Sequence, residues 1–238
     1  MATIRLPIIL PFCYAYLPAS KKQLIGRSWP AISNPHPGKT HTMEGPKDNR
    51  GVYFCSMNEL FDIANESRDY MNCTFQVSIL EVYNETVNDL LSRQNARPQG
   101  GLDIRMLNNE VFVEGLVWET VSCCEDVENL IAMASSNRRV ASNNVNEYSS
   151  RSHLVLSIKT SCSDLVTNQT RRGKLSLIGL AGSERLKETE ALGVRLREAQ
   201  NINRSLSALG DVVEALGKSS SHVPYRNSKL TFLLQVCV

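Results

Sequence analysis

The sequence predicts an α/β fold, with one central, mostly parallel sheet and helices on both of its faces. Three observations predict this class. Segments rich in β-branched and aromatic residues, such as residues 74–83, alternate along the chain with segments of helical periodicity. Residues 174–180 are apolar enough for a strand that is buried on both faces. Between Ile202 and Leu216, apolar residues recur at spacings of four and three, which is one face of a long helix.

The composition of the 238-residue chain is that of a globular protein, with 42% hydrophobic and 21% charged residues. The net charge of +2 gives no general affinity for nucleic acid, so an anionic partner must be met by a local cationic patch. The seven cysteines contain no C-x-x-C pair, which argues against a disulfide framework and a zinc site. We expect free thiols in a reducing cytosol. We expect no membrane association, because the apolar residues 6–17 are too few to span a bilayer.

The N-terminal part of the chain is poor in periodicity. Four prolines between residues 18 and 37 predict a loop. We therefore divide the chain into a non-standard, irregular segment, residues 1–32, and one domain, residues 33–238. No internal repeat and no second domain are visible.

From Gly51 onward, the elements follow one another clearly. Apolar residues in residues 52–64 form the buried stripe of a helix that runs to about Asn65. Residues 74–83 predict a strand, and Leu90 and Leu91 predict a short helix after it.

The second half continues the alternation. Residues 111–117 predict a strand, and Ser122 with Glu125 forms a capping box that opens the next helix. Leu154, Leu156 and Ile158 alternate as in a strand. In the long helix the stripe consists of Ile202, Leu206, Leu209, Val213 and Leu216, and Gly217 ends the helix.

Gly38-Lys39-Thr40 is the end of a phosphate-binding Walker A pattern, G-x-x-x-x-G-K-S/T. In such loops the backbone N–H groups surround phosphates, the lysine reaches the β- and γ-phosphates, and the hydroxyl binds Mg²⁺. The tripeptide alone is a weak signal, because it also occurs by chance in surface turns.

Four longer segments resemble the kinesin motor domain, in the order in which that family has them. Residues 146–153, N-E-Y-S-S-R-S-H, resemble switch I, and residues 180–185, L-A-G-S-E-R, resemble switch II. Residues 201–210 are similar to the relay helix, and residues 222–231 to the microtubule-facing loop and the helix after it. The chain is identified as a member of this family over at least residues 38–235, and an unrelated P-loop kinase or GTPase is excluded. Residues 80–86 resemble the C-terminal-motor class.

The resemblance implies a kinesin-type P-loop NTPase fold and a site for ATP and Mg²⁺. It implies nucleotide contacts from Gly38, Lys39, Thr40, His41, Ser149 and Ser152, and Mg²⁺ contacts from Thr40 and Ser150. For catalysis it implies Ser150 in switch I, a γ-phosphate contact from the Gly182 N–H, and an ion pair between Arg151 and Glu184 that latches the two switches. An arginine fork suits a carboxylate, which fits this pairing.

The resemblance also implies that microtubules are the partner, and that the protein lies in the cytoplasm on the microtubule cytoskeleton. Because the microtubule surface is acidic, a cationic face is needed. The matching positions are Lys187, Arg195, Arg204, Tyr225, Arg226 and Lys229. The resemblance also implies other kinesin chains as further partners, through regions missing from this sequence.

Three departures from the family pattern predict a weakened nucleotide site. Pro35 and Pro37 lie in the phosphate loop, where they remove N–H donors, and each lost charge-assisted hydrogen bond is worth about 1.5–3 kcal/mol. Gly179 stands where the family has the switch II aspartate, which organises the water shell of Mg²⁺. The family's first strands are not recognisable before Ser33, and the family continues beyond Val238 with another helix and a core strand.

Two functions remain open from the sequence. The first is ATP-dependent movement along microtubules, with an impaired nucleotide site. The alternative is a microtubule-binding module that does not hydrolyse ATP, or a truncated, inactive fragment.

Overall fold

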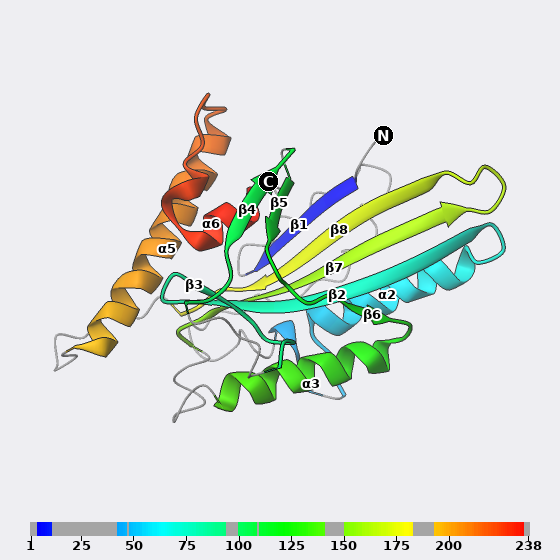
Figure 1. The fold of residues 1–238 in the computed structure, drawn as a ribbon, viewed down its shortest axis with the longest axis horizontal. Coiled ribbons are helices and arrows are strands. Elements are labelled where there is room, and N and C mark those ends of the chain that lie inside the picture. The colour runs from blue at the N-terminus through cyan, green and yellow to red at the C-terminus, as the bar shows by residue number, and fades with distance from the viewer. Residues whose placement is uncertain are drawn as a thin grey trace.

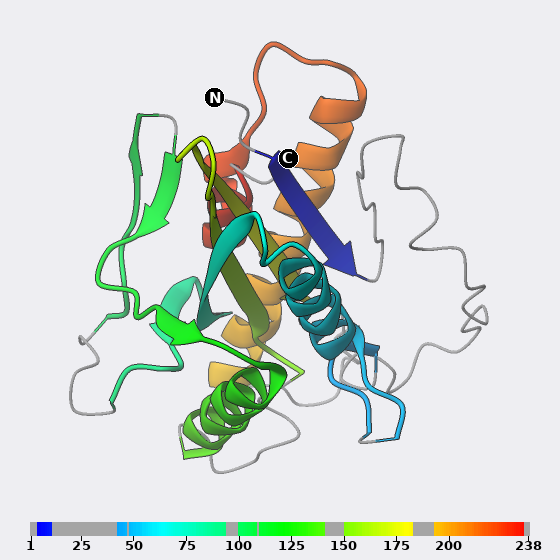
Figure 2. The ribbon, with the colours of Figure 1, turned by 90° about the vertical axis from the view of Figure 1, so that its right-hand side faces the viewer.

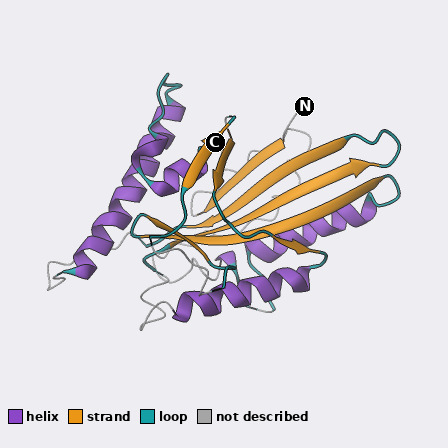
Figure 3. Cartoon of the chain, in the orientation of Figure 1, coloured by secondary structure: helices purple, strands orange, loops and turns teal. Residues whose placement is uncertain are grey.

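The computed structural model describes residues 4–10, 42–46, 48–93, 100–108, 110–140, 150–182 and 193–235. Its strands form a central sheet with helices on two faces (Figures 1 and 3). In chain order the elements are β1 (Ile4–Leu10), α2 (Val52–Glu66), β2 (Met71–Tyr83), β3 (Thr86–Asp89), β4 (Ile104–Leu107), β5 (Glu110–Val113), β6 (Glu119–Val121), α3 (Cys124–Val140), β7 (His153–Asp164), β8 (Thr170–Gly179), α5 (Val194–Gly217), η3 (Tyr225–Asn227) and α6 (Lys229–Leu234). No helix among these residues is both long and apolar enough to cross a membrane.

The α/β class is confirmed, and the helices lie on both faces of the sheet. One core cluster joins α2 and α3 to the sheet through residues such as Met57, Ile131 and Ile158. Figure 2 shows α2 and α3 together on that side. The other cluster joins α6 and the β4–β5 hairpin to the opposite face through residues such as Leu230 and Ile178.

The prediction that the sheet is mostly parallel is wrong for the described strands. Their order is β1-β8-β7-β2-β3, with β6 also paired to β2, and only the β1–β8 pairing is parallel. The reason is that β7 leads into β8 through residues 165–169 alone, and β2 leads into β3 through a two-residue turn. Such short connections can join only antiparallel neighbours.

The prediction of a short helix at Leu90 and Leu91 is also wrong. After β2 the chain reverses its direction and forms the strand β3. Asn84 and Glu85 form the turn with φ of 48° and 58°. Two successive residues with positive φ are typical of the tight hairpin turn that matches strand twist.

The first described strand lies in the segment that the sequence predicts to be irregular. β1 pairs along its length with β8 and ends with Leu10 opposite Gly179. Its β-branched residues favour a strand, and Pro7 is tolerated because β1 is at the edge of the sheet that the described strands form. The division at residues 32 and 33 stays a prediction.

Two cysteines that we expected to be free thiols are paired. Cys73 in β2 and Cys162 in β7 form a disulfide across 89 residues of sequence, and they are directly opposite in the strand register. The spacing of the cysteines along the sequence could not predict this pair. The two strands become neighbours only in the folded sheet, where their register brings the two Cα atoms to within 4.0 Å of each other. The thiols of Cys55, Cys123 and Cys124 are free, as expected.

The helices begin and end close to where the sequence places them, with two corrections. The carboxylate that accepts backbone N–H bonds before α3 belongs to Asp126 and not to Glu125. In α5, which ends at Gly217 as expected, Val213 is 59% exposed, whereas Val212 is 1% exposed. The buried face is thus rotated by one residue at this point, because it follows the spacing from Ala208 to Val212.

Candidate functional site

The segments that resemble the two switches meet beyond the end of β8. The Gly182 N–H donates a hydrogen bond to the Ser150 carbonyl oxygen at 2.7 Å. The neighbouring Ala181 N–H donates to His153 Nδ1 at 3.1 Å. Two segments that lie about thirty residues apart in the sequence are therefore joined by direct hydrogen bonds.

His153 extends this connection to α5. Its ring is 3% exposed, and Nε2 lies 2.8 Å from the Ser205 hydroxyl. Because Nδ1 accepts from Ala181, the hydrogen of a neutral ring is on Nε2, which donates to Ser205. The Ser205 hydroxyl in turn donates to the Ile202 carbonyl oxygen at 2.8 Å. Sequence analysis did not single out His153 or Ser205.

Arg151 makes a second connection to α5. Its Nη1 lies 2.7 Å from Glu198 Oε2, and Glu198 also accepts a hydrogen bond from the Tyr83 hydroxyl. Burial, and then this hydrogen bond and the charge of Glu198, raise the pKa of Tyr83 to about 12. Glu184, the expected partner of Arg151, lies outside the described residues, so the latch between them stays a prediction.

Sequence reasoning missed Glu198, although a signal for it exists. Glu198 lies four residues before Ile202, on the buried face of α5, and is itself 7% exposed. A carboxylate on the buried face of an amphipathic helix needs a cation or hydrogen-bond donors. Its position in the stripe could therefore have marked it as a partner for a switch residue.

Ser152 is directed toward α3. It is 1% exposed, and its hydroxyl accepts a hydrogen bond from Arg138 Nη2 at 2.6 Å. Arg138 also pairs with Glu81 in β2, with Nε 3.3 Å from Oε2. The structure thus anchors the start of β7 to α3, and the nucleotide contact expected of Ser152 stays a prediction.

Much of the expected nucleotide site lies outside the described residues. These residues are Gly38, Lys39, Thr40, His41, Ser149 and Glu184. The described part offers the Ser150 and Ser152 hydroxyls and the Gly182 N–H, and all three residues already have interaction partners. The residue at the end of β8 is Gly179, which offers no carboxylate. No cluster of metal-ligating side chains occurs in the part of the chain that the structure describes. This donor set by itself does not fit Mg²⁺.

The expected microtubule-facing residues fall on α5, η3 and α6. Arg204 in α5 and Arg226 in η3 are exposed, while Tyr225 and Lys229 are partly buried. The Arg226 guanidinium lies 5.8 Å from the Phe232 ring centre, which orients it by a cation–π contact. Lys187 lies outside the described residues, and only the backbone of Arg195 is described.

The loop before α6 is held firmly. Ser228 and Thr231 form a reciprocal capping box, in which the Thr231 N–H donates to Ser228 Oγ at 3.1 Å and the Ser228 N–H to Thr231 Oγ1 at 3.2 Å. The Lys229 N–H donates to the Glu85 carboxylate in the β2–β3 turn at 2.9 Å. Leu230 is fully buried against the sheet. The geometry of this face is therefore set by the sheet.

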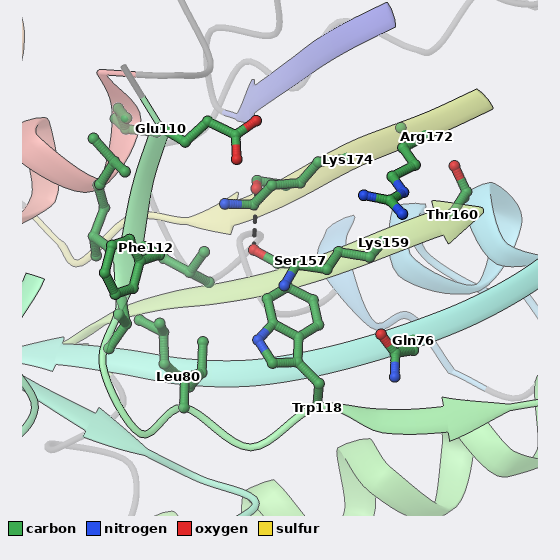
Figure 4. Close-up of a pocket in the computed structure, with 18 of the residues that line it drawn as sticks. Gln76, Leu80, Glu110, Phe112, Trp118, Ser157, Lys159, Thr160, Arg172 and Lys174 are labelled. Carbon is green, nitrogen blue, oxygen red and sulfur yellow. Dashed lines mark hydrogen bonds between the residues drawn. The ribbon is translucent and has the colours of Figure 1, made fainter. Parts of the chain in front are cut away.

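A separate groove of about 730 Å³ lies over β2, β7 and β8 (Figure 4). Lys159 lies over the Trp118 ring at 3.8 Å from its centre, and Arg172 and Lys174 also line the groove. The Ser157 and Ser176 hydroxyls form a hydrogen bond on its floor at 3.0 Å. None of the expected site residues lines this groove. It is therefore distinct from the place where the two switch segments meet at Ser150 and Gly182, which we call the switch junction.

Comparison with known proteins agrees with the resemblance. The model of the kinesin motor domain family matches residues 35–238. The chain is 50% identical to the kinesin-like protein KIN-14R of Arabidopsis thaliana and 49% identical to KIN-14E of Oryza sativa subsp. japonica, over 199 residues in each case. These matches cover 83% of this chain but only 18% of each relative, so the chain spans about a fifth of their length.

Solved structures agree as well. A structure described as a fast kinesin superposes with a TM-score of 0.74 at 39% identity, covering 84% of this chain and 57% of that one. The motor domain of the Saccharomyces cerevisiae protein KAR3 superposes with a TM-score of 0.70 at 36% identity, covering 84% and 60%.

Proposed function

Because this chain belongs to the kinesin motor-domain family, a family of microtubule-based motors, we propose that it binds microtubules through α5, η3 and α6 and responds only weakly to Mg·ATP. It would act in the cytoplasm, on the microtubule cytoskeleton. Nucleotide with Mg²⁺ is the ligand of the family, and in this chain its binding would be weakened.

The rigid attachment of the microtubule-facing segment carries this proposal. The capping box at Ser228, the bond from the Lys229 N–H to Glu85 and the buried Leu230 fix α6 to the sheet. A pre-formed cationic surface binds an acidic partner without first having to order itself. Arg204 and Arg226 are among the exposed cations that the structure describes there.

The response to ATP is proposed to be weak because position 179, on the metal side of the expected site, carries no carboxylate. Gly179 ends β8 next to the switch junction, and a glycine supplies neither charge nor a metal ligand. Prolines in the phosphate loop remove further donors.

Microtubule co-sedimentation of the purified chain, with and without Mg·ATP, tests this function. We expect binding that weakens as the salt concentration rises and that changes less than about twofold with Mg·ATP, since exposed charges are screened by salt. Replacement of both Arg204 and Arg226 by Glu should weaken binding about tenfold or more, since like charges then face the acidic surface. Arg68→Glu, an exposed charge directly after the end of α2, is the matched control and should leave binding unchanged. In Figure 1, α2 and α5 lie on opposite sides of the view.

ATP-driven movement is the second candidate, and the intact junction favours it. The bonds from Gly182 to Ser150, from His153 to Ser205 and from Arg151 to Glu198 connect both switch segments to α5. Release of the chain from microtubules by Mg·ATP would support this candidate and contradict the weak response. Absence of binding in the folded chain would contradict both.

A further inference from the structure

The hydroxyl of Tyr53 is buried without a partner. Tyr53 lies in α2, on the face that packs against the sheet, and is 1% exposed. Among the residues that the structure describes, no group accepts a hydrogen bond from its hydroxyl or donates one to it. Because a buried hydroxyl that has lost its water partners lowers stability, such a group needs an explanation.

The hydroxyl is directed toward the end of β8. A β-carbon placed on Gly179 would lie 3.4 Å from Tyr53 Oη and 3.9 Å from the Leu154 β-carbon. The first distance is an ordinary contact, so a side chain fits at the first atom. The φ angle of Gly179 is not among the positive values, and the backbone therefore does not require glycine there.

The distance suits a hydrogen bond to a carboxylate. Carboxylate oxygens lie about 2.4 Å from their β-carbon, so the oxygens of an acidic side chain at position 179 could approach the hydroxyl to hydrogen-bond distance. The hydroxyl keeps its hydrogen for this purpose, because burial, and next the charge of Glu44, raise the pKa of Tyr53 well above its usual value.

We propose that Tyr53 is a positioning residue for an acidic side chain at position 179, and that in this chain, with Gly179, the hydroxyl is a donor without its acceptor. The pair would connect α2, the helix that follows the phosphate loop, with the strand that leads into switch II. In the present chain the Tyr53 hydroxyl makes no hydrogen bond to this strand. The proposal goes beyond the function proposed above, and its first test needs neither microtubules nor nucleotide.

A double-mutant cycle tests the pairing, with urea unfolding of four full-length proteins: the parent, Tyr53→Phe, Gly179→Asp and the double variant. In the parent, Tyr53→Phe removes an unpaired hydroxyl and should leave the folding equilibrium constant unchanged or raise it. In the Gly179→Asp background the same change removes a hydrogen bond to a charge, and should lower the constant about tenfold or more. A loss that occurs in the Gly179→Asp background and not in the parent is the result expected from a direct pairing.

Two further variants keep the test decisive. Gly179→Asn also carries an acceptor and takes the place of Gly179→Asp if that variant does not fold. Tyr70→Phe removes an exposed hydroxyl that bonds to Ser67 and should have the same small effect in every background. Equal effects of Tyr53→Phe in both backgrounds, or an improvement of Gly179→Asp by Tyr53→Phe, would overturn the proposal.

Binding of a fluorescent ADP analogue with Mg²⁺ then separates this inference from the proposed function. Gly179→Asp should tighten binding more with Tyr53 present than with Phe at this position, since a placed carboxylate serves the metal better than a free one. If the stability cycle shows the pairing and no variant binds the nucleotide, the pairing is supported and the phosphate loop is shown to be the part that fails.

Discussion

Removal of the Glu198 carboxylate should destabilise the protein more than removal of an exposed carboxylate at the surface would. Arg151 Nη1 lies 2.7 Å from Glu198 Oε2, and the two side chains are 20% and 9% exposed. Loss of one partner from a fully buried pair costs about 3–5 kcal/mol, because the other charge stays buried. Arg151 is partly open to water, which can take over some of its hydrogen bonds, so we expect Glu198→Ala to cost about 2–3 kcal/mol.

Urea unfolding followed by circular dichroism measures this loss, and the same helix supplies the control. Glu214 pairs with Lys218 one turn away, and their side chains are 63% and 68% exposed. Exposed pairs at this spacing contribute about 0.3–0.5 kcal/mol, so Glu214→Ala should have a small effect. If Glu198→Ala lowers the free energy of unfolding by no more than Glu214→Ala does, the ion pair between switch I and α5 does not stabilise the protein.

The isosteric change Glu198→Gln tests the charge of the same carboxylate. A negative charge beside Tyr83 disfavours the phenolate, and burial disfavours it still more, which together with the hydrogen bond raises the pKa of Tyr83 to about 12. Without the charge this pKa should fall, yet stay above its ordinary value of 10.0, because the burial remains. Ultraviolet absorbance of tyrosinate records the titration, and Tyr83→Phe identifies the contribution of this residue. An unchanged titration would show that the Glu198 carboxylate does not act on Tyr83.

Three further predictions concern local devices of the fold. Ser228→Ala removes the cap of α6 and should lower the free energy of unfolding, measured with urea, by about 1 kcal/mol. A change near zero would show that the capping box does not stabilise the protein. Reduction of the Cys73–Cys162 disulfide, which spans 89 residues of sequence, should lower stability by about 2–4 kcal/mol and be visible as a lower Tm in dithiothreitol, whereas Cys73→Ser should have the same Tm with and without reductant. Backbone N–H bonds in its turn lower the pKa of Asp164, so its stabilisation is present above the unfolded pKa of about 3.9 and is lost as the pH falls through the folded value. Asp164→Asn should therefore flatten the fall of the urea midpoint between about pH 5 and pH 2, and an unchanged slope would contradict this.

The sequence predicted the local elements well because their signals are local. The helix stripe at Phe61 and the end of α5 at Gly217 follow from periodicity and from a glycine at the right place. The family could be identified in the same way, since each switch motif is a short, continuous run of residues, and the family model confirms it.

Strand direction and long-range partners could not be predicted in this way. The turn at Asn84 and Glu85 reverses the chain, although neither residue is glycine and no turn dipeptide marks the place. The partner of Arg151 in the described structure is 47 residues away, and the partner of Cys73 is 89 residues away. Such pairs depend on which strands become neighbours and in which register, and no short window of sequence contains that information.

The sequence by itself determined the class of fold and the family, and it predicted the positions of the switch segments and of the microtubule-facing residues. Only the tertiary structure decided that Glu198 binds Arg151 and that His153 connects the switch junction to α5. It also decided that the Tyr53 hydroxyl lies 3.4 Å from the place of a β-carbon on Gly179. The physical reason is that motifs and periodicity are encoded by neighbours along the chain. Hydrogen bonds, ion pairs and buried contacts between distant residues arise only when packing has fixed where each element lies.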